Sequence, residues 1–130
     1  MAEIKDKIAK QTRDLTQALA RLKEAATLPP TRIYKDATIQ RFEFCFELSW
    51  KLLQNVNASN GLTDYGPKNS IRSAAQLGLI DDPDAWIDAL NKRNLTVHTY
   101  LEKIADEVYI KAKEFIPLLE KLLSKLKKQS

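Results

Sequence analysis

The sequence predicts an all-α protein, an antiparallel up-and-down four-helix bundle with one additional short helix, formed by a single domain over residues 1–130. Apolar residues recur at three- and four-residue steps through almost the whole chain, as on the buried face of a helix. No segment alternates apolar and polar residues as a half-buried strand does. Most of the five prolines and three glycines fall between the periodic segments, where they mark the turns of a bundle.

The first helix is predicted over about residues 2–26. Pro29-Pro30 ends it, because proline lacks a backbone N–H and restricts the residue before it to extended conformations. Its buried stripe consists of apolar residues at three-, four- and seven-residue steps: Ile4, Ile8, Leu15, Leu19, Leu22 and Ala26.

The second helix is predicted from Tyr34 or Asp36 to Asn57, with Asn60-Gly61 closing it. It is apolar on most faces, which is typical of a helix at the centre of a bundle or buried on two sides. Burying all of these faces would require a partner surface as well as the bundle, so a homodimer is predicted. The apolar residues are Phe42, Phe44, Cys45, Phe46, Leu48, Trp50, Leu52, Leu53 and Val56.

One polar stripe interrupts this apolar helix. Glu43, Glu47 and Lys51 follow one another at four-residue steps, and Glu47 can pair with Lys51 in the favourable order. The stripe is either a narrow solvent-facing strip or a polar seam that lines a pocket together with Arg41 or Arg93. The scarcity of other exposed positions on this helix favours the seam.

Three further helical stretches complete the bundle. A short helix begins at Pro67 and ends before Gly78. Asp82-Pro83-Asp84 begins the fourth helix with a capping aspartate, a first-turn proline and an acidic residue near the helix N-terminus. A fifth stretch spans about residues 101–126, and Pro117 is expected to kink or split it.

Composition narrows the function classes. No apolar run reaches the ~18 residues of a membrane span, and the charged, helical start of the chain predicts no signal peptide. Cys45 is the only cysteine, so no internal disulfide forms and a cytoplasmic location is expected. One cysteine and one histidine do not make a zinc cage, so neither a metal nor a cofactor is expected. The net charge of +4, much of it in the C-terminal lysines, allows contact with nucleic acid without arguing for it.

The segment from Arg93 to Tyr100 gathers the residue types of a phosphate-handling site. It contains the only histidine, His98, five positions after Arg93 and two before Tyr100, with an amide at Asn94. An imidazole moves protons both ways near neutral pH, and a guanidinium binds phosphate oxygens and stabilises their charge. Metal-free RNA cleavage needs these two roles and a second acid or base, which a two-fold dimer would supply.

The geometry of this cluster depends on the local backbone. On a continuous helix, Arg93, Asn94, His98 and Tyr100 would lie within a wedge of roughly 160° and could face one cleft. A break at the β-branched pair Thr96-Val97 would change this arrangement. The alternative interpretation of His98 is purely structural, since a lone histidine in a helical protein more often serves packing than catalysis.

The pattern Arg93-x4-His98-x-Tyr100 resembles the motif of the HEPN superfamily (higher eukaryotes and prokaryotes nucleotide-binding). Within it, the chain resembles the small nucleotidyltransferase substrate-binding proteins, relatives of the HepT toxins. The resemblance covers most of the chain. It also rests on the segments 36–44 (DATIQRFEF), 47–51 (ELSWK) and 78–80 (GLI), and on Trp86.

This resemblance implies a dimeric helical bundle whose partner is a minimal nucleotidyltransferase. In the HepT-like branch it implies a metal-independent ribonuclease toxin, with Arg93 and His98 as the catalytic pair and Tyr100 as the residue to which the nucleotidyltransferase adds AMP. The chain itself has no Gly-Ser turn, no aspartates on strands and no Gly-rich phosphate loop, so it is not a nucleotidyltransferase. The leading hypothesis is a homodimeric partner of that enzyme, which binds a nucleotide or RNA phosphate at this motif or is modified on Tyr100. An endoribonuclease toxin and a purely structural bundle are the alternatives.

Overall fold

The structure, a computed structural model, describes residues 2–129; Met1 and Ser130, the ends of the predicted domain, lie outside the described residues. No strand occurs in this part of the chain, which confirms the all-α class. The elements in chain order are α1 (Ala2–Ala26), α2 (Arg32–Ser59), α3 (Pro67–Gln76), α4 (Pro83–Asn94), the 3-10 helix η1 (Leu95–His98) and α5 (Glu102–Gln129).

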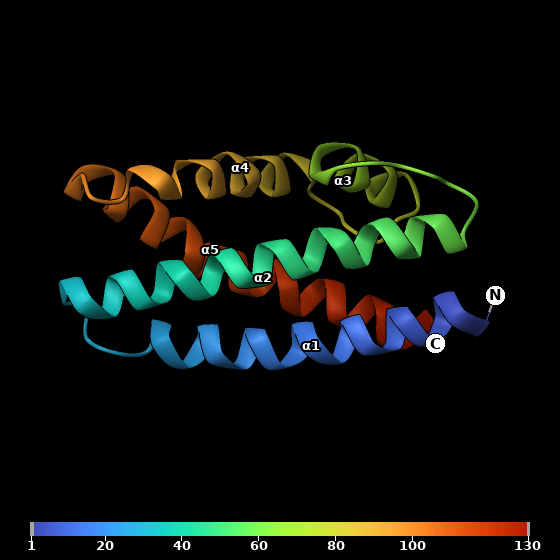
Figure 1. Ribbon diagram of the computed structural model, residues 1–130, viewed down its shortest axis with the longest axis horizontal. Coiled ribbons are helices and arrows are strands. Elements are labelled where there is room, and N and C mark those ends of the chain that lie inside the picture. The colour runs from blue at the N-terminus through green and yellow to red at the C-terminus, as the bar shows by residue number, and fades with distance from the viewer. Residues whose placement is uncertain (1, 130) are drawn as a thin grey trace.

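Helix α2 is the centre of the arrangement (Figure 1). Helix α1 runs antiparallel beside it, α3 and α4 follow one another along its opposite side, and α5 crosses behind it. All four of these helices contact α2. The apolar character of most α2 faces therefore reflects packing inside a single chain to a large extent.

An aromatic cluster joins α2, α4 and α5 at the core. The ring of Phe115 lies 5.5 Å from that of Phe42 and 4.9 Å from that of Trp86, measured between centroids, in edge-to-face geometry. Phe46 also packs against Phe115, at 5.8 Å. All four side chains are almost completely buried. Aromatic groups of this size contribute much of the burial energy of a small core, so this cluster fixes α2 relative to α4.

The second helix begins earlier than predicted. Thr31 caps it, because its hydroxyl oxygen accepts a hydrogen bond of 3.3 Å from the backbone N–H of Tyr34. A threonine at this position satisfies one of the N–H groups that a helix start leaves unpaired. Helix α2 therefore starts at Arg32, and this extra turn carries Arg32 toward the motif.

Pro117 does not split the last helix, contrary to that alternative, since α5 continues from Glu102 to Gln129. Proline removes one backbone hydrogen bond and crowds the preceding turn. Pro117 is exposed, so its ring lies against solvent, and the buried side chains of Phe115 and Leu119 hold the helix on both sides of it. Tertiary packing outweighs the local preference here.

Candidate functional site

The motif lies where α4 ends, and the helix is not continuous through it. Helix α4 stops at Asn94 and η1 follows. The hydroxyl of Thr96 donates to the carbonyl of Arg93 at 2.8 Å, and the hydroxyl of Thr99 donates to the carbonyl of Thr96 at 2.9 Å. Such local bonds compete with the helical ladder. The helix is therefore not continuous through the motif, and the single wedge of four residues is wrong. The break falls after Asn94, two residues before the predicted position, and Thr96-Val97 lie within η1.

Arg93 is anchored against α2 instead of facing solvent. Its guanidinium forms an ion pair with Glu47 and lies 5.9 Å from the centroid of the Phe46 ring. The indole N–H of Trp50 donates to the other carboxylate oxygen of Glu47 at 3.2 Å. Arg93 also donates to the side-chain oxygen of Asn94 at 3.0 Å. Both charged side chains are about two-thirds buried, so the pair holds the end of α4 to α2.

The predicted pair of Glu47 and Lys51 is therefore wrong. Lys51 is exposed and lies over the ring of Trp50, with its ammonium 5.9 Å from the centroid. Arg41 does not join the seam either. Its guanidinium donates to the backbone carbonyl of Arg21 at 2.7 Å and lies 3.8 Å from Glu24, which ties α2 to α1. The four-residue spacing of Glu43, Glu47 and Lys51 predicts that they share one face of α2, but it does not predict which neighbouring helix each side chain contacts.

His98 and Tyr100 form an exposed pair beyond the end of α4. Their ring centroids are 6.3 Å apart with the rings nearly edge to face. Tyr100 is 75% exposed and His98 is also exposed. The motif thus divides into an anchored arginine and two groups that molecules in solution can reach. Both an exposed imidazole and an exposed phenol suit chemistry on an external substrate.

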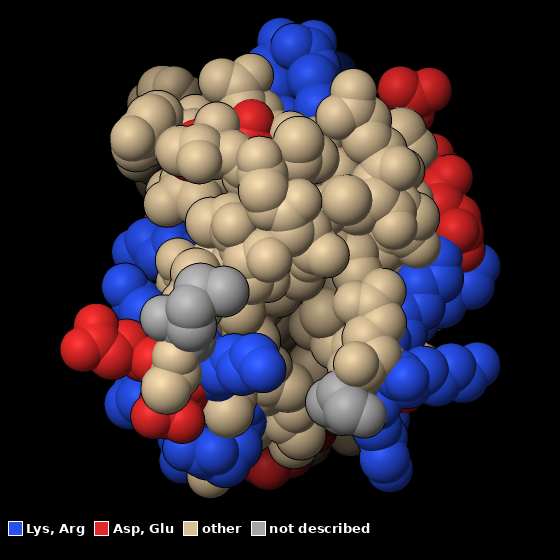
Figure 2. All heavy atoms as spheres, turned by 90° about the vertical axis from the view of Figure 1, so that its right-hand side faces the viewer, with Lys and Arg blue, Asp and Glu red and all other residues tan. Residues whose placement is uncertain are grey.

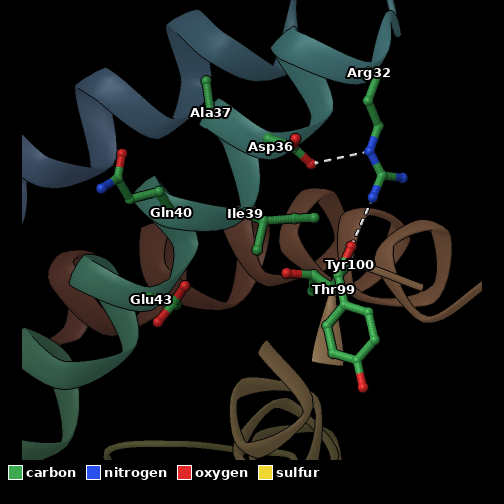
Figure 3. A pocket seen from close by; sticks show the side chains of 8 residues that line it. All are labelled: Arg32, Asp36, Ala37, Ile39, Gln40, Glu43, Thr99 and Tyr100. Atoms are coloured by element: carbon green, nitrogen blue, oxygen red, sulfur yellow. Dashed lines mark hydrogen bonds and ion pairs between the residues drawn. The ribbon is translucent and has the colours of Figure 1, made fainter. Parts of the chain in front are cut away.

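An open pocket of about 470 Å³ lies between the first turns of α2 and the segment after η1. Arg32 spans the gap, donating to the carbonyl of Thr99 at 2.6 Å and pairing with Asp36 at 3.5 Å (Figure 3). The lining residues are Arg32, Asp36, Ala37, Ile39, Gln40, Glu43, Thr99 and Tyr100.

Sequence reasoning found only two of these residues, Tyr100 and Glu43. It missed Asp36 and Gln40, although the spacing of Asp36, Gln40 and Glu43 at four and three residues indicates one face of a helix. It also missed Arg32, because the predicted helix began after it. Glu43 is the one member of the predicted polar stripe that lines this pocket.

Cys45, the only cysteine of the chain, is buried and does not line this pocket. Burial raises the pKa of the Cys45 thiol to about 12, so it stays protonated and is not a nucleophile at neutral pH. No group of three or more His, Cys, Asp or Glu in residues 2–129 is placed to hold a metal ion. None of the described helices is long and apolar enough to cross a membrane.

Comparison with known proteins identifies the family to which this helical chain belongs. The family described as "Nucleotidyltransferase substrate binding protein like" matches residues 10–128, which include all of the motif and nearly all of the bundle. The chain belongs to this family. The family assignment and the helical fold agree with the resemblance seen in the motif and its flanking segments.

Two solved structures and one curated protein are similar to this family member. A crystal structure of a Thermus thermophilus protein is 38% identical, with a TM-score of 0.81 over 86% of this chain and 98% of that one. A Haemophilus influenzae structure, described as the fold of a substrate-binding domain of a nucleotidyltransferase, is 28% identical, with a TM-score of 0.69 over 94% and 98%. A curated Haemophilus influenzae protein named "Probable ribonuclease HepT" is 34% identical over 97 residues, which are 71% of this chain and 66% of that protein, just under two thirds of its length.

Proposed function

We propose that this protein is the partner of a minimal nucleotidyltransferase and presents Tyr100 to that enzyme as an acceptor for AMP. The observation that carries the proposal is the 75% exposure of the Tyr100 side chain beside His98. An acceptor tyrosine must be accessible to the active site of a second protein, and Tyr100 meets this requirement. The anchored Arg93 lies in the same motif, where it would favour an incoming phosphate by its charge. The same site is proposed to bind a nucleotide or RNA phosphate when Tyr100 is unmodified.

The test is modification by the partner enzyme. A minimal nucleotidyltransferase encoded beside this chain, incubated with it, ATP and magnesium, should add one or more AMP groups to Tyr100. Intact mass and peptide mapping would detect them. Tyr65 is 79% exposed and serves as a matched control. The Tyr65→Phe variant should be modified like the wild type, whereas Tyr100→Phe should not. Equal modification of Tyr100→Phe would remove this residue as the main acceptor.

A metal-independent endoribonuclease is the second candidate. It is favoured by the 34% identity to a protein named as a probable ribonuclease and by the exposure of His98, the only histidine of the chain. In this reaction the 2′-hydroxyl of RNA attacks the adjacent phosphorus. His98 removes or returns a proton, and the 5′-oxygen leaves with a proton, so a 2′,3′-cyclic phosphate forms. Arg93 would stabilise the charge that develops on the phosphate oxygens.

RNA cleavage in the presence of EDTA tests this candidate. The wild type should leave 2′,3′-cyclic or 3′-phosphate ends, and His98→Ala should lose about 10²–10⁴-fold in rate, as when general acid–base help is removed. Arg93→Lys should retain little of the cleavage activity, because lysine lacks the bidentate fork of arginine. Circular dichroism must show that His98→Ala still folds. Binding of RNA without any cleavage by the wild type would leave only the first proposal.

We further propose that the protein acts as a cytoplasmic homodimer. On α2, Ile33 is 77% exposed and Phe44 is 55% exposed. They are eleven residues apart, which places them within about 20° of one another on a straight helix. Ala37 and Gln40 lie between them on this face, and both line the pocket. Pairing of two copies through this face would place two motifs and two pockets along one interface.

A further inference from the structure

The pocket beside Tyr100 has the guanidinium of Arg32, paired with Asp36, at one end and the carboxylate of Glu43 at the other. In Figure 3 the guanidinium of Arg32 and the carboxylate of Glu43 lie on opposite sides, with the side chain of Ile39 between them. Ile39 belongs to the apolar core and is almost fully buried, so it forms an apolar floor. A ligand that fits such a site has an anionic end, a flat apolar body and an end that donates hydrogen bonds.

The two ends differ in how their charges are satisfied. Arg32 bonds to the carbonyl of Thr99 and to Asp36, but a guanidinium has five donors and these contacts do not use them all. Glu43 is half-buried and has no hydrogen-bond or ion-pair partner among residues 2–129. A carboxylate removed from part of its water without a partner is unfavourable. Glu43 is therefore the acceptor in this pocket that is ready for an external donor.

Tyr100 supplies a planar surface at the edge of the same pocket. It is one of the lining residues, and the residue is 75% exposed. Unstacked bases of single-stranded RNA commonly stack on exposed aromatic rings while protein groups bind their Watson–Crick edges. The volume of about 470 Å³ falls within the range of roughly 300–1,000 Å³ that is usual for small-molecule sites.

We propose that this pocket is a base-reading subsite for guanine, with Glu43 as the specificity-determining residue and Arg32 as the phosphate contact. The inference rests on the proposed nucleotide- or RNA-binding function and adds the identity of the base. A carboxylate is an acceptor only, with two oxygens side by side. Guanine presents two adjacent donors on its Watson–Crick edge, the N1–H and the N2 amine, which match those oxygens.

The other three bases fit this carboxylate less well. Adenine and cytosine each present one amino donor beside a ring nitrogen that accepts, and uracil presents one N–H between two carbonyl oxygens. Each would place an acceptor against Glu43, which costs binding energy because two acceptors repel. A cationic side chain from another protein would also satisfy Glu43, but it would leave the phosphate-binding capacity of Arg32 and the stacking surface of Tyr100 unused.

Calorimetric titration of the protein with each of the four nucleoside 5′-monophosphates tests the proposal. GMP should bind more tightly than UMP by about fivefold or more, the lower limit expected for a good bidentate base contact. Glu43→Gln keeps the side-chain shape but replaces one acceptor with a donor, so the affinities for the four nucleotides should fall within about twofold of one another. Arg32→Gln should weaken binding of all four to a similar extent, since the phosphate is common to them.

A matched control separates this effect from a general loss of charge. Glu107 is an exposed glutamate on α5 outside the pocket, and Glu107→Gln should retain the preference for GMP. The proposal is overturned if none of the four nucleotides binds at millimolar concentration, if the wild type shows no preference, or if Glu43→Gln keeps the preference. Modification of Tyr100 with AMP, or RNA binding without base preference, would then show that the proposed function survives while the guanine subsite does not.

Discussion

The environment of Arg93 explains how a motif arginine can belong to an exposed site and still be held in place. Its countercharge is Glu47 on α2, and Glu47 is itself oriented by the indole of Trp50. A guanidinium fixed by one carboxylate retains donors for a phosphate. Glu47 is therefore a positioning residue for the site, because it acts on a ligand only through Arg93.

Replacing Glu47 should cost stability. Glu47→Ala removes the countercharge of Arg93 and the acceptor of Trp50, so the free energy of unfolding should fall by roughly 1–3 kcal/mol. The loss is smaller than that of a fully buried pair, because 29% and 32% of the two side chains remain exposed and water screens them. Urea unfolding followed by circular dichroism measures it. Lys51→Ala is the control and should stay within about 0.5 kcal/mol. The reverse order of effects would support pairing of Glu47 with Lys51 instead of Arg93.

At the scale of elements, a polar contact holds α4 to α5. Lys111 is only 8% exposed, and its ammonium lies 2.7 Å from Asp88 on α4 and 3.5 Å from Glu114. The hydrogen bond from Lys111 lowers the pKa of Asp88 below its usual value despite some burial. Burial opposes the charge of Lys111, but its bonds to Asp88 and the nearby Glu114 outweigh this and raise its pKa. Because α4 leads directly into the motif, this contact also fixes where the motif begins.

The lowered pKa of Asp88 predicts that the free energy of unfolding depends on pH. A carboxyl whose pKa is lower in the folded state stabilises the protein above its unfolded pKa of about 3.9, and this contribution is lost as the pH falls through the folded value. Asp88→Asn should therefore lower the free energy of unfolding by roughly 1–3 kcal/mol at pH 7. The loss stays modest because 45% of the Asp88 side chain is exposed. Urea unfolding at pH 7 and at about pH 3 should show the difference from the wild type shrinking in acid.

Asp84 provides the control for that measurement. It is exposed in the first turn of α4, where it has only the weak attraction of the helix N-terminus. Asp84→Asn should change stability by less than about 1 kcal/mol at pH 7. An effect of Asp88→Asn no larger than this would show that the contact with Lys111 contributes little to holding α4.

At the scale of the whole molecule, the apolar surface is unevenly distributed. The end view in Figure 2 shows lysine and arginine side chains around much of the rim, with a hollow between tan surfaces. A large apolar groove lies between α1, α2 and α5, lined by Ile8, Leu19 and Val56 among others. The exposed Ile33 and Phe44 lie elsewhere, on the α2 face that carries the pocket residues Ala37 and Gln40. That face is the one we propose as the dimer interface.

Light scattering at micromolar concentration tests the dimer. The wild type should have twice the mass of the chain, and Phe44→Asp should be a monomer, because it would bury a charge in an apolar interface. Ile110 on α5 is a matched control, since its side chain is 56% exposed, close to the 55% of Phe44. Ile110→Asp should leave the dimer intact. A monomeric wild type would contradict the proposed interface and any activity that depends on two motifs.

Local chemistry allowed the sequence alone to determine the helices and most of their ends. Apolar spacing depends on 3.6 residues per turn, and caps depend on groups a few residues apart. Asp82 accepts a hydrogen bond from the backbone of Ala85 at 3.1 Å, and Gly78 adopts a φ of 76° after α3, both as the sequence predicts. The family follows from the sequence for the same reason, because the order of its motifs along the chain is itself a sequence property.

Only the tertiary structure decided which side chains meet. Glu47 pairs with Arg93 instead of Lys51 because α4 packs against α2. Arg32 reaches the carbonyl of Thr99, 67 residues away, and so creates a pocket that no local pattern indicates. Such contacts depend on how helices distant in sequence are placed by their shared core, and spacing along one helix contains no information about the partner it will meet.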